Sequence, residues 1–168
     1  MNSAPSPAPT PAGKSQASHA SASIHTRSEP PLWALRLGYA GLAPFVIGAL
    51  TVWLVSHDLT PFAMLGLAAY AAVIASFLGG IYWGLAMRDG QASPLFPFVW
   101  GVVPSLVAAV AVIMPPWAGL VVLGFLLIAC YLVDRKQYRL FHMNGWLTLR
   151  FRLTIVASLC CFLGASGV

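Results

Sequence analysis

The fold is decided by the stretch at residues 62–87, which reads FAMLGLAAYAAVIASFLGGIYWGLAM and contains no charged residue. A helix rises about 1.5 Å per residue, so about 20 residues cross the hydrocarbon core of a bilayer, and this stretch is long enough. Its apolar residues are continuous and do not recur on one face, as they would in a soluble amphipathic helix. The stretch is therefore predicted to be a transmembrane helix.

Four further apolar blocks accompany this one, at about residues 37–55, 95–114, 117–133 and 149–168. The third and fourth spans are separated only by Pro115 and Pro116. Proline breaks a helix interior, so a tight hairpin is predicted there. The last apolar block proper is short, at about residues 153–168, and it spans only if it begins near Leu149, with Arg150 and Arg152 extending to the lipid headgroups.

The composition agrees with a membrane protein. Apolar residues make up 59% of the 168-residue chain and charged residues 8%, against about 25% in soluble domains. The mean hydropathy is +0.81. We therefore predict an all-α, polytopic membrane bundle of about five transmembrane helices over residues 32–168. Residues 1–31 are rich in Ser, Ala and Pro and lack an apolar run, so they are predicted to form a disordered tail.

The basic residues predict the orientation of the bundle. All nine Lys and Arg precede the first span or lie between the second and third or the fourth and fifth. Because such residues are retained in the cytoplasm, the N-terminus is predicted inside and the C-terminus outside. The net charge of +5 is then a feature of membrane topology and does not indicate nucleic-acid binding. We expect a multi-pass protein of the bacterial inner membrane.

Small residues recur every fourth position along the second span and predict a smooth ridge for helix packing. The ridge consists of Ala68, Ala72, Ser76, Gly80 and Gly84. Packing against a neighbouring helix of the same chain is the first interpretation, and homodimerisation is the alternative.

Bases and aromatic residues mix between the fourth and fifth spans, a composition typical of a segment in the headgroup layer. The residues expected to contact lipid headgroups or a partner are Arg135, Lys136, Arg139, Trp146, Arg150 and Arg152. The segment either only fixes the topology, or it also recognises an anionic lipid or docks a partner.

No catalytic residue, metal site or cofactor is predicted. The four acids do not pair, no ionisable residue lies in the middle of a predicted span, and the histidines lack metal-ligand spacing. The neighbours His57 and Asp58 give only a weak signal. We read the three cysteines, which lie within apolar blocks, as small packing residues.

Two segments resemble a known membrane family. They are residues 70–87, YAAVIASFLGGIYWGLAM, and the stretch WLTLRFRLT that starts at Trp146. Both are similar to segments of the transmembrane protein 69-like family, also called domain of unknown function 3429. The resemblance of the chain to this family extends over residues 33–166. That family commonly has His where this chain has Tyr82, and Pro where it has Asn144–Gly145. The resemblance implies an integral membrane protein, found in bacteria and in eukaryotes, including mitochondria, without an established activity.

The leading hypothesis is a non-catalytic membrane component that packs with, or helps to assemble, other membrane proteins. Its expected partners are the lipid bilayer and another membrane protein or a second copy of itself, with no nucleic acid. The alternative is a passive carrier or channel for a small solute, formed by an oligomer. A lipid-modifying enzyme ranks last, with His57, Asp58 and His142 as its candidate residues.

Overall fold

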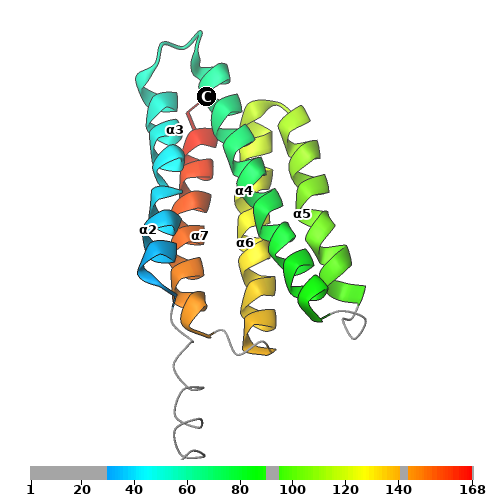
Figure 1. The fold of residues 1–168 in the computed structure, drawn as a ribbon. Helices are drawn as coiled ribbons and strands as arrows, with labels where there is room; N and C mark the ends of the chain where they lie inside the picture. The colour runs from blue at the N-terminus through cyan, green and yellow to red at the C-terminus, as the bar shows by residue number, and fades with distance from the viewer. Residues whose placement is uncertain (1–29, 90–94, 141–143, 168) are drawn as a thin grey trace, which may run out of the picture.

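The computed structural model describes residues 30–89, 95–140 and 144–167, and within these ranges every regular element is an α-helix. The helices, which Figure 1 shows in their arrangement, are α2 (Leu32–Ala40), α3 (Ala43–Leu54), α4 (Thr60–Asp89), α5 (Leu95–Ile113), α6 (Pro116–Leu140) and α7 (Asn144–Ala165). They form five segments long and apolar enough to cross a membrane. The predicted all-α polytopic bundle is confirmed. All but two residues of the predicted tail lie outside the described residues.

The first membrane segment consists of two helices, because α2 and α3 are separated by a turn at Gly41 and Leu42. Pro44 lies in the first turn of α3, where its missing N–H costs nothing. In the turn, the hydroxyl of Tyr70 on α4 donates a hydrogen bond of 2.8 Å to the Gly41 carbonyl. The segment starts at Leu32, five residues before the predicted block at residues 37–55, and it therefore includes Arg36.

Helices α6 and α7 also extend beyond the apolar blocks that predict them. The fourth block ends at residue 133, whereas α6 continues to Leu140, and α7 begins at Asn144 instead of near Leu149. A charged residue ends an apolar block but does not end a helix, since Asp, Arg, Lys and Gln are tolerated in helices. The charged ends of these two helices therefore belong to the bundle.

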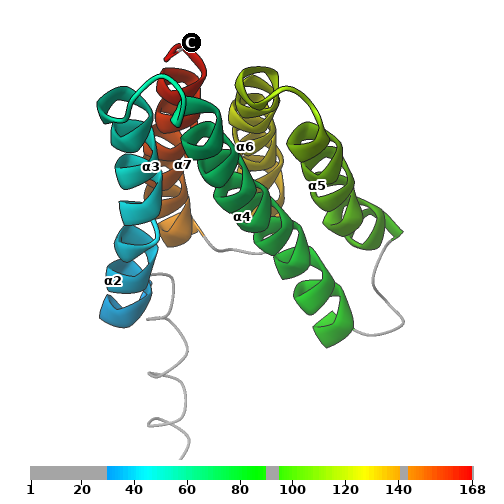
Figure 2. The ribbon, with the colours of Figure 1, turned by 90° about the horizontal axis from the view of Figure 1, so that it is seen from above.

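Helix α4 holds the bundle together. It runs obliquely across the other helices (Figure 2) and packs against α3, α5, α6 and α7. Helices α6 and α7 are close neighbours, and α7 also packs against α2 and α3. The loop between α3 and α4, the turn between α5 and α6 and the end of α7 share one end of the bundle (Figure 1).

The core relies on small residues where helices meet. Ala71 and Ala75 of α4 are fully buried, and so are Leu120 and Leu123 of α6 and Cys161 of α7. Lipid tails are as apolar as the helices, so close packing rather than hydrophobic burial holds such a bundle together.

Helices α4 and α5 approach each other very closely at two glycines. A Cβ placed on Gly79 would overlap the carbonyl oxygen of Gly101. Only glycine allows the two backbones to approach so closely at this point. The hairpin between α5 and α6 has a similar approach, because a Cβ on Gly119 would overlap the Ala111 carbonyl.

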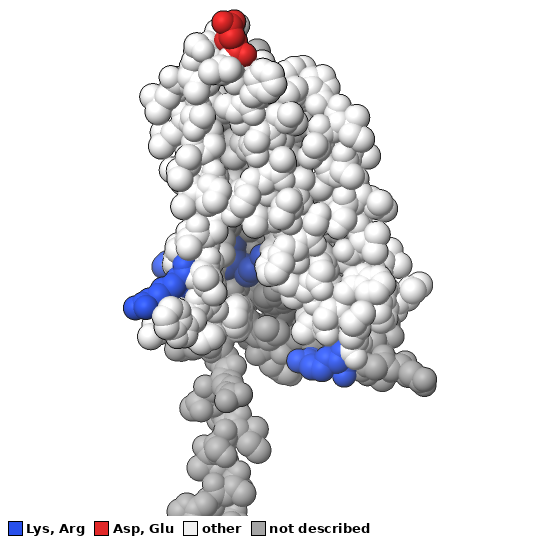
Figure 3. Space-filling model, turned by 45° about the horizontal axis from the view of Figure 1, so that its top comes forward, with Lys and Arg blue, Asp and Glu red and all other residues white. Residues whose placement is uncertain are grey.

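The basic side chains lie towards one end of the bundle (Figure 3). Basic side chains gather at the end where α2 begins, while acidic atoms are visible at the opposite end, which includes the loop with Asp58. The two ends of the molecule therefore differ in electrostatic character.

Candidate functional site

A buried ion pair lies inside the bundle towards its basic end. Asp134 of α6 is 1% exposed. Its Oδ1 accepts a hydrogen bond of 2.7 Å from the Tyr82 hydroxyl on α4. Its Oδ2 accepts a bond of 2.9 Å from Nε of Arg150 on α7, and an Nη of the same guanidinium also donates to Oδ2. Three helices thus meet at a single carboxylate.

The pair compensates two charges that would be costly alone. A lone carboxylate or guanidinium in an apolar bundle loses its hydration, and the mutual attraction restores part of that free energy. The Arg150 side chain is only 11% exposed and Asp134 is 2% exposed in its side chain, so water screens the pair weakly. The interaction therefore links α6 to α7, and Tyr82 adds α4.

The geometry is that of a clamp between helices. Both carboxylate oxygens of Asp134 already accept hydrogen bonds from side chains, and the residue is closed to solvent. The site therefore links three helices through one carboxylate.

The sequence did not predict this site. Arg150 was expected to reach the headgroups, whereas its guanidinium binds Asp134 inside the bundle. Asp134 was expected to pair with no other acid, and no contact was predicted for Tyr82. The available signal was one acid near the end of one apolar helix and one base near the start of the next, which an antiparallel hairpin brings together.

The other predicted headgroup residues take several positions. Arg135 and Lys136 are exposed on α6, Trp146 is half-buried, and Arg139 belongs to α6 but its side chain lies outside the described residues. Arg152 is exposed on α7 and donates a long hydrogen bond of 3.4 Å to the Tyr39 hydroxyl. Their contact with lipid remains a prediction.

The predicted ridge of small residues divides into a buried half and an exposed half. Ala68 is buried, Ala72 and Ser76 are half-buried, and Gly80 and Gly84 are exposed. A helix turns about 100° per residue, so a four-residue spacing advances by about 40° at each step. The ridge therefore winds out of the core. In the part of the chain that the structure describes, no atom of another helix lies within 4 Å of a Cβ built on Gly80 or Gly84.

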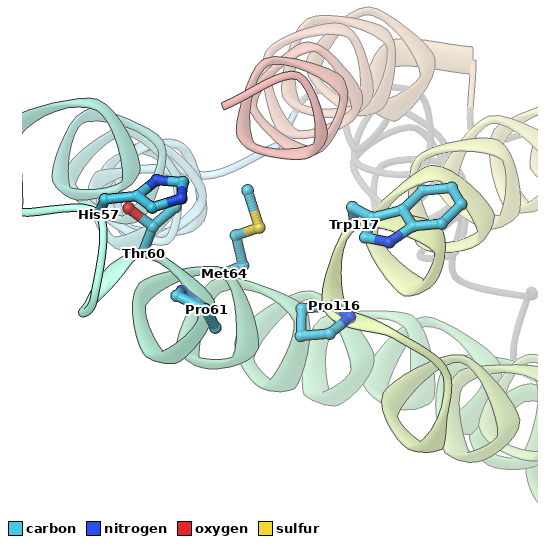
Figure 4. Close-up of a pocket in the computed structure, with 6 residues that line it drawn as sticks. All are labelled: His57, Thr60, Pro61, Met64, Pro116 and Trp117. Carbon is cyan, nitrogen blue, oxygen red and sulfur yellow. The ribbon is translucent and has the colours of Figure 1, made fainter. Parts of the chain in front are cut away.

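A shallow hollow lies at the opposite end of the bundle, between the starts of α4 and α6 (Figure 4). Its volume is about 210 Å³, and its lining residues are His57, Thr60, Pro61, Met64, Pro116 and Trp117. The Thr60 hydroxyl donates to the Ser56 carbonyl at 3.3 Å and is thus engaged. An imidazole among mostly apolar walls does not form a nucleophile and base pair.

Metal ligation has no candidate among residues 30–89, 95–140 and 144–167. No three His, Cys, Asp or Glu side chains there are grouped to hold an ion. The cysteines Cys130, Cys160 and Cys161 are free and buried. They occupy packing positions in the core cluster.

Comparison with known proteins adds two findings. A family model described as "Protein of unknown function (DUF3429)" matches residues 30–166. Transmembrane protein 69 of Xenopus tropicalis is 37% identical over 94 residues, which cover 54% of this chain. The aligned part covers only 36% of that relative's own length. No solved structure matches the chain.

Proposed function

The chain belongs to the DUF3429 family of unknown function, and from this premise we propose that it is a non-catalytic component of a bacterial inner membrane that binds another membrane protein side-on. The five membrane segments make it an integral membrane protein. The saturated clamp at Asp134 supports a structural role for the polar residues of the bundle.

The exposed face of α4 carries this proposal. Gly80 and Gly84 form a GxxxG pair, and both positions have open space where a side chain would project. Val73, Phe77 and Met87 are 64%, 66% and 66% exposed. At about 100° per residue, all five lie within about 80° of the helix circumference. This glycine face is a notch edged by large apolar side chains.

The occupant that suits such a notch is a transmembrane helix with small residues of its own. GxxxG pairs let two backbones approach closely, so that van der Waals contacts and Cα–H contacts accumulate. Inside the molecule, Gly79 and Gly101 provide this kind of contact between α4 and α5. We infer that Gly80 and Gly84 provide it towards a partner helix.

Two substitutions test the glycine face. Gly80→Leu and Gly84→Leu fill the notch, yet both positions are open in the monomer, so the bundle should fold with unchanged stability. The tagged variants, extracted in mild detergent, are expected to lose the membrane protein that co-purifies with the wild-type chain. Ala109→Leu, an exposed position on α5, is the matched control and should retain the partner.

Crosslinking identifies the occupant directly. The native cysteines are buried, so a Gly84→Cys variant adds one accessible thiol on the glycine face. A crosslink to another membrane protein is expected. Retention of the partner by both leucine variants would overturn the proposal. A crosslink only to a second copy would replace it with homodimerisation, and solute flux into proteoliposomes would then test the oligomeric carrier.

A further inference from the structure

A second hollow lies at the basic end, between α2 and the first turns of α7. Its volume is about 350 Å³, within the range of ligand sites of ~300–1,000 Å³. Tyr39, Thr148 and Arg152 supply polar groups to its lining, and Leu35 and Leu149 supply apolar ones. The hollow is separate from the Asp134 clamp and from the glycine face of α4.

The polar groups favour an anion. Arg152 carries the positive charge, and among the described residues that line this hollow none is acidic. Its bond to the Tyr39 hydroxyl is long, at 3.4 Å, and a guanidinium has five N–H donors, so donors remain for a ligand. The Tyr39 hydroxyl accepts this bond, so the single O–H groups of Tyr39 and Thr148 can each donate to an oxyanion.

The start of α7 adds to this preference. The helix begins at Asn144, and Gly145 and Thr148 of its first turns line the hollow. The first backbone N–H groups of a helix have no partner within it, and the helix dipole places partial positive charge there. Oxyanions such as phosphate are stabilised in this position.

The surroundings of the hollow point to the membrane surface. Leu32 and Trp33 of the adjoining α2 are 71% and 70% exposed, and the Arg36 guanidinium lies 5.3 Å from the centre of the Trp33 ring. Exposed Trp beside Arg is typical of the boundary between headgroups and hydrocarbon. A ligand in this hollow meets the Arg152 guanidinium and the apolar side chains of Leu35 and Leu149.

We propose that this hollow binds the phosphate of an anionic phospholipid, with Arg152, Tyr39 and Thr148 as its ligands. The phosphate accepts hydrogen bonds from the guanidinium and the hydroxyls, and Leu35 lies beside the apolar part of the lipid. Free phosphate shares the same oxyanion chemistry, but it makes no use of the apolar wall. The proposal does not depend on a partner at the glycine face.

Native mass spectrometry of the full chain in detergent measures this binding. Phosphatidylglycerol, phosphatidylcholine and inorganic phosphate are titrated separately. Phosphatidylglycerol should bind most tightly, and Arg152→Gln should weaken it about tenfold, the effect of losing one charge-assisted hydrogen bond. Arg152→Lys should recover part of the affinity, and Thr148→Val should lose a smaller part. Arg135→Gln removes an exposed base outside the hollow and should change the affinity less than about twofold.

Three results would overturn the proposal. Equal weakening by Arg135→Gln and Arg152→Gln would show diffuse charge attraction without a site. Binding of inorganic phosphate as tight as that of phosphatidylglycerol would make a soluble anion the ligand. An unchanged affinity in an Arg152→Gln variant that melts like the wild type would leave the hollow without a role. Gly80→Leu should bind the lipid normally, which separates this test from that of the glycine face.

Discussion

At the scale of single residues, the stability of the charged Asp134 side chain inside the bundle depends mainly on its neighbour Arg150. Its carboxylate is buried, and Arg150 supplies the compensating charge. The contribution of such a pair to stability is small compared with the cost of breaking it. Replacing both partners with apolar residues is often neutral or stabilising, whereas removing one leaves an uncompensated charge.

Removing one partner of the clamp should therefore destabilise the bundle strongly. For Asp134→Ala or Arg150→Ala, we expect a loss of ~3–5 kcal/mol in unfolding free energy, measured by denaturant titration in detergent micelles. The double variant Asp134→Leu with Arg150→Met should recover most of that loss, because no charge is then left unpaired. Additive losses in the double variant would contradict a clamp between these two residues.

The same scale shows what the sequence could and could not predict. Continuous apolar residues predicted that positions 62–87 lie in a membrane, but not which face of the helix meets protein. Gly79, outside the predicted ridge, makes the close contact with Gly101, while Gly80 faces outwards. Which residue pairs with Arg150 depends on the register between α6 and α7. The hydrophobic pattern of the sequence does not reveal this register.

At the scale of helices, the first and second membrane segments differ in length and continuity. Helix α4 has 30 residues and is thus about 45 Å long, more than the ~30 Å hydrocarbon core. It runs obliquely across the bundle (Figure 2), and tilting is one way in which a long helix is accommodated in a bilayer. The first segment is instead divided at Gly41 and Leu42, where Pro44 begins a new helix. The hydrogen bond from Tyr70 to the Gly41 carbonyl at this division was not predicted from the sequence.

The hydrogen bond at this division should contribute measurably to stability. Tyr70→Phe removes the donor to the Gly41 carbonyl, and we expect a loss of ~0.6–1.7 kcal/mol, the range for polar contacts between membrane helices. Thermal unfolding in detergent, followed by circular dichroism, measures the change. Tyr131→Phe on α6 is the control, because its ring packs against Phe151, a contact that the substitution preserves. An equal effect of both substitutions would show that the Gly41 bond contributes nothing specific.

At the scale of the whole molecule, the sequence predicted that basic residues gather at one end. They precede the first apolar block and lie in every second connection, and helix connectivity brings them to one end of the bundle (Figure 3). Which side of a membrane this end faces stays a prediction. The number of spans follows from block length alone. The tilt of α4, the division of the first segment and the hollow beside Arg152 require three-dimensional packing and could not be predicted.

The orientation proposed for the inner membrane has a direct test. Alkaline phosphatase is active only outside the cytoplasm, so fusions after Val55 and Pro116 should be active, and fusions after Gly90 and Lys136 inactive. This outcome follows from retention of basic segments in the cytoplasm. Activity of the fusion after Lys136, at an expression level equal to that of the others, would reverse the assignment of the basic end.

The link between Asp134 and Arg150 also bears on how the chain is made. Only 16 residues separate the two partners along the chain, so the guanidinium leaves the ribosome soon after the carboxylate. A lone acid partitions poorly into lipid, and so does a lone arginine. The two helices therefore enter the bilayer most favourably together, as a hairpin in which each charge already has its partner.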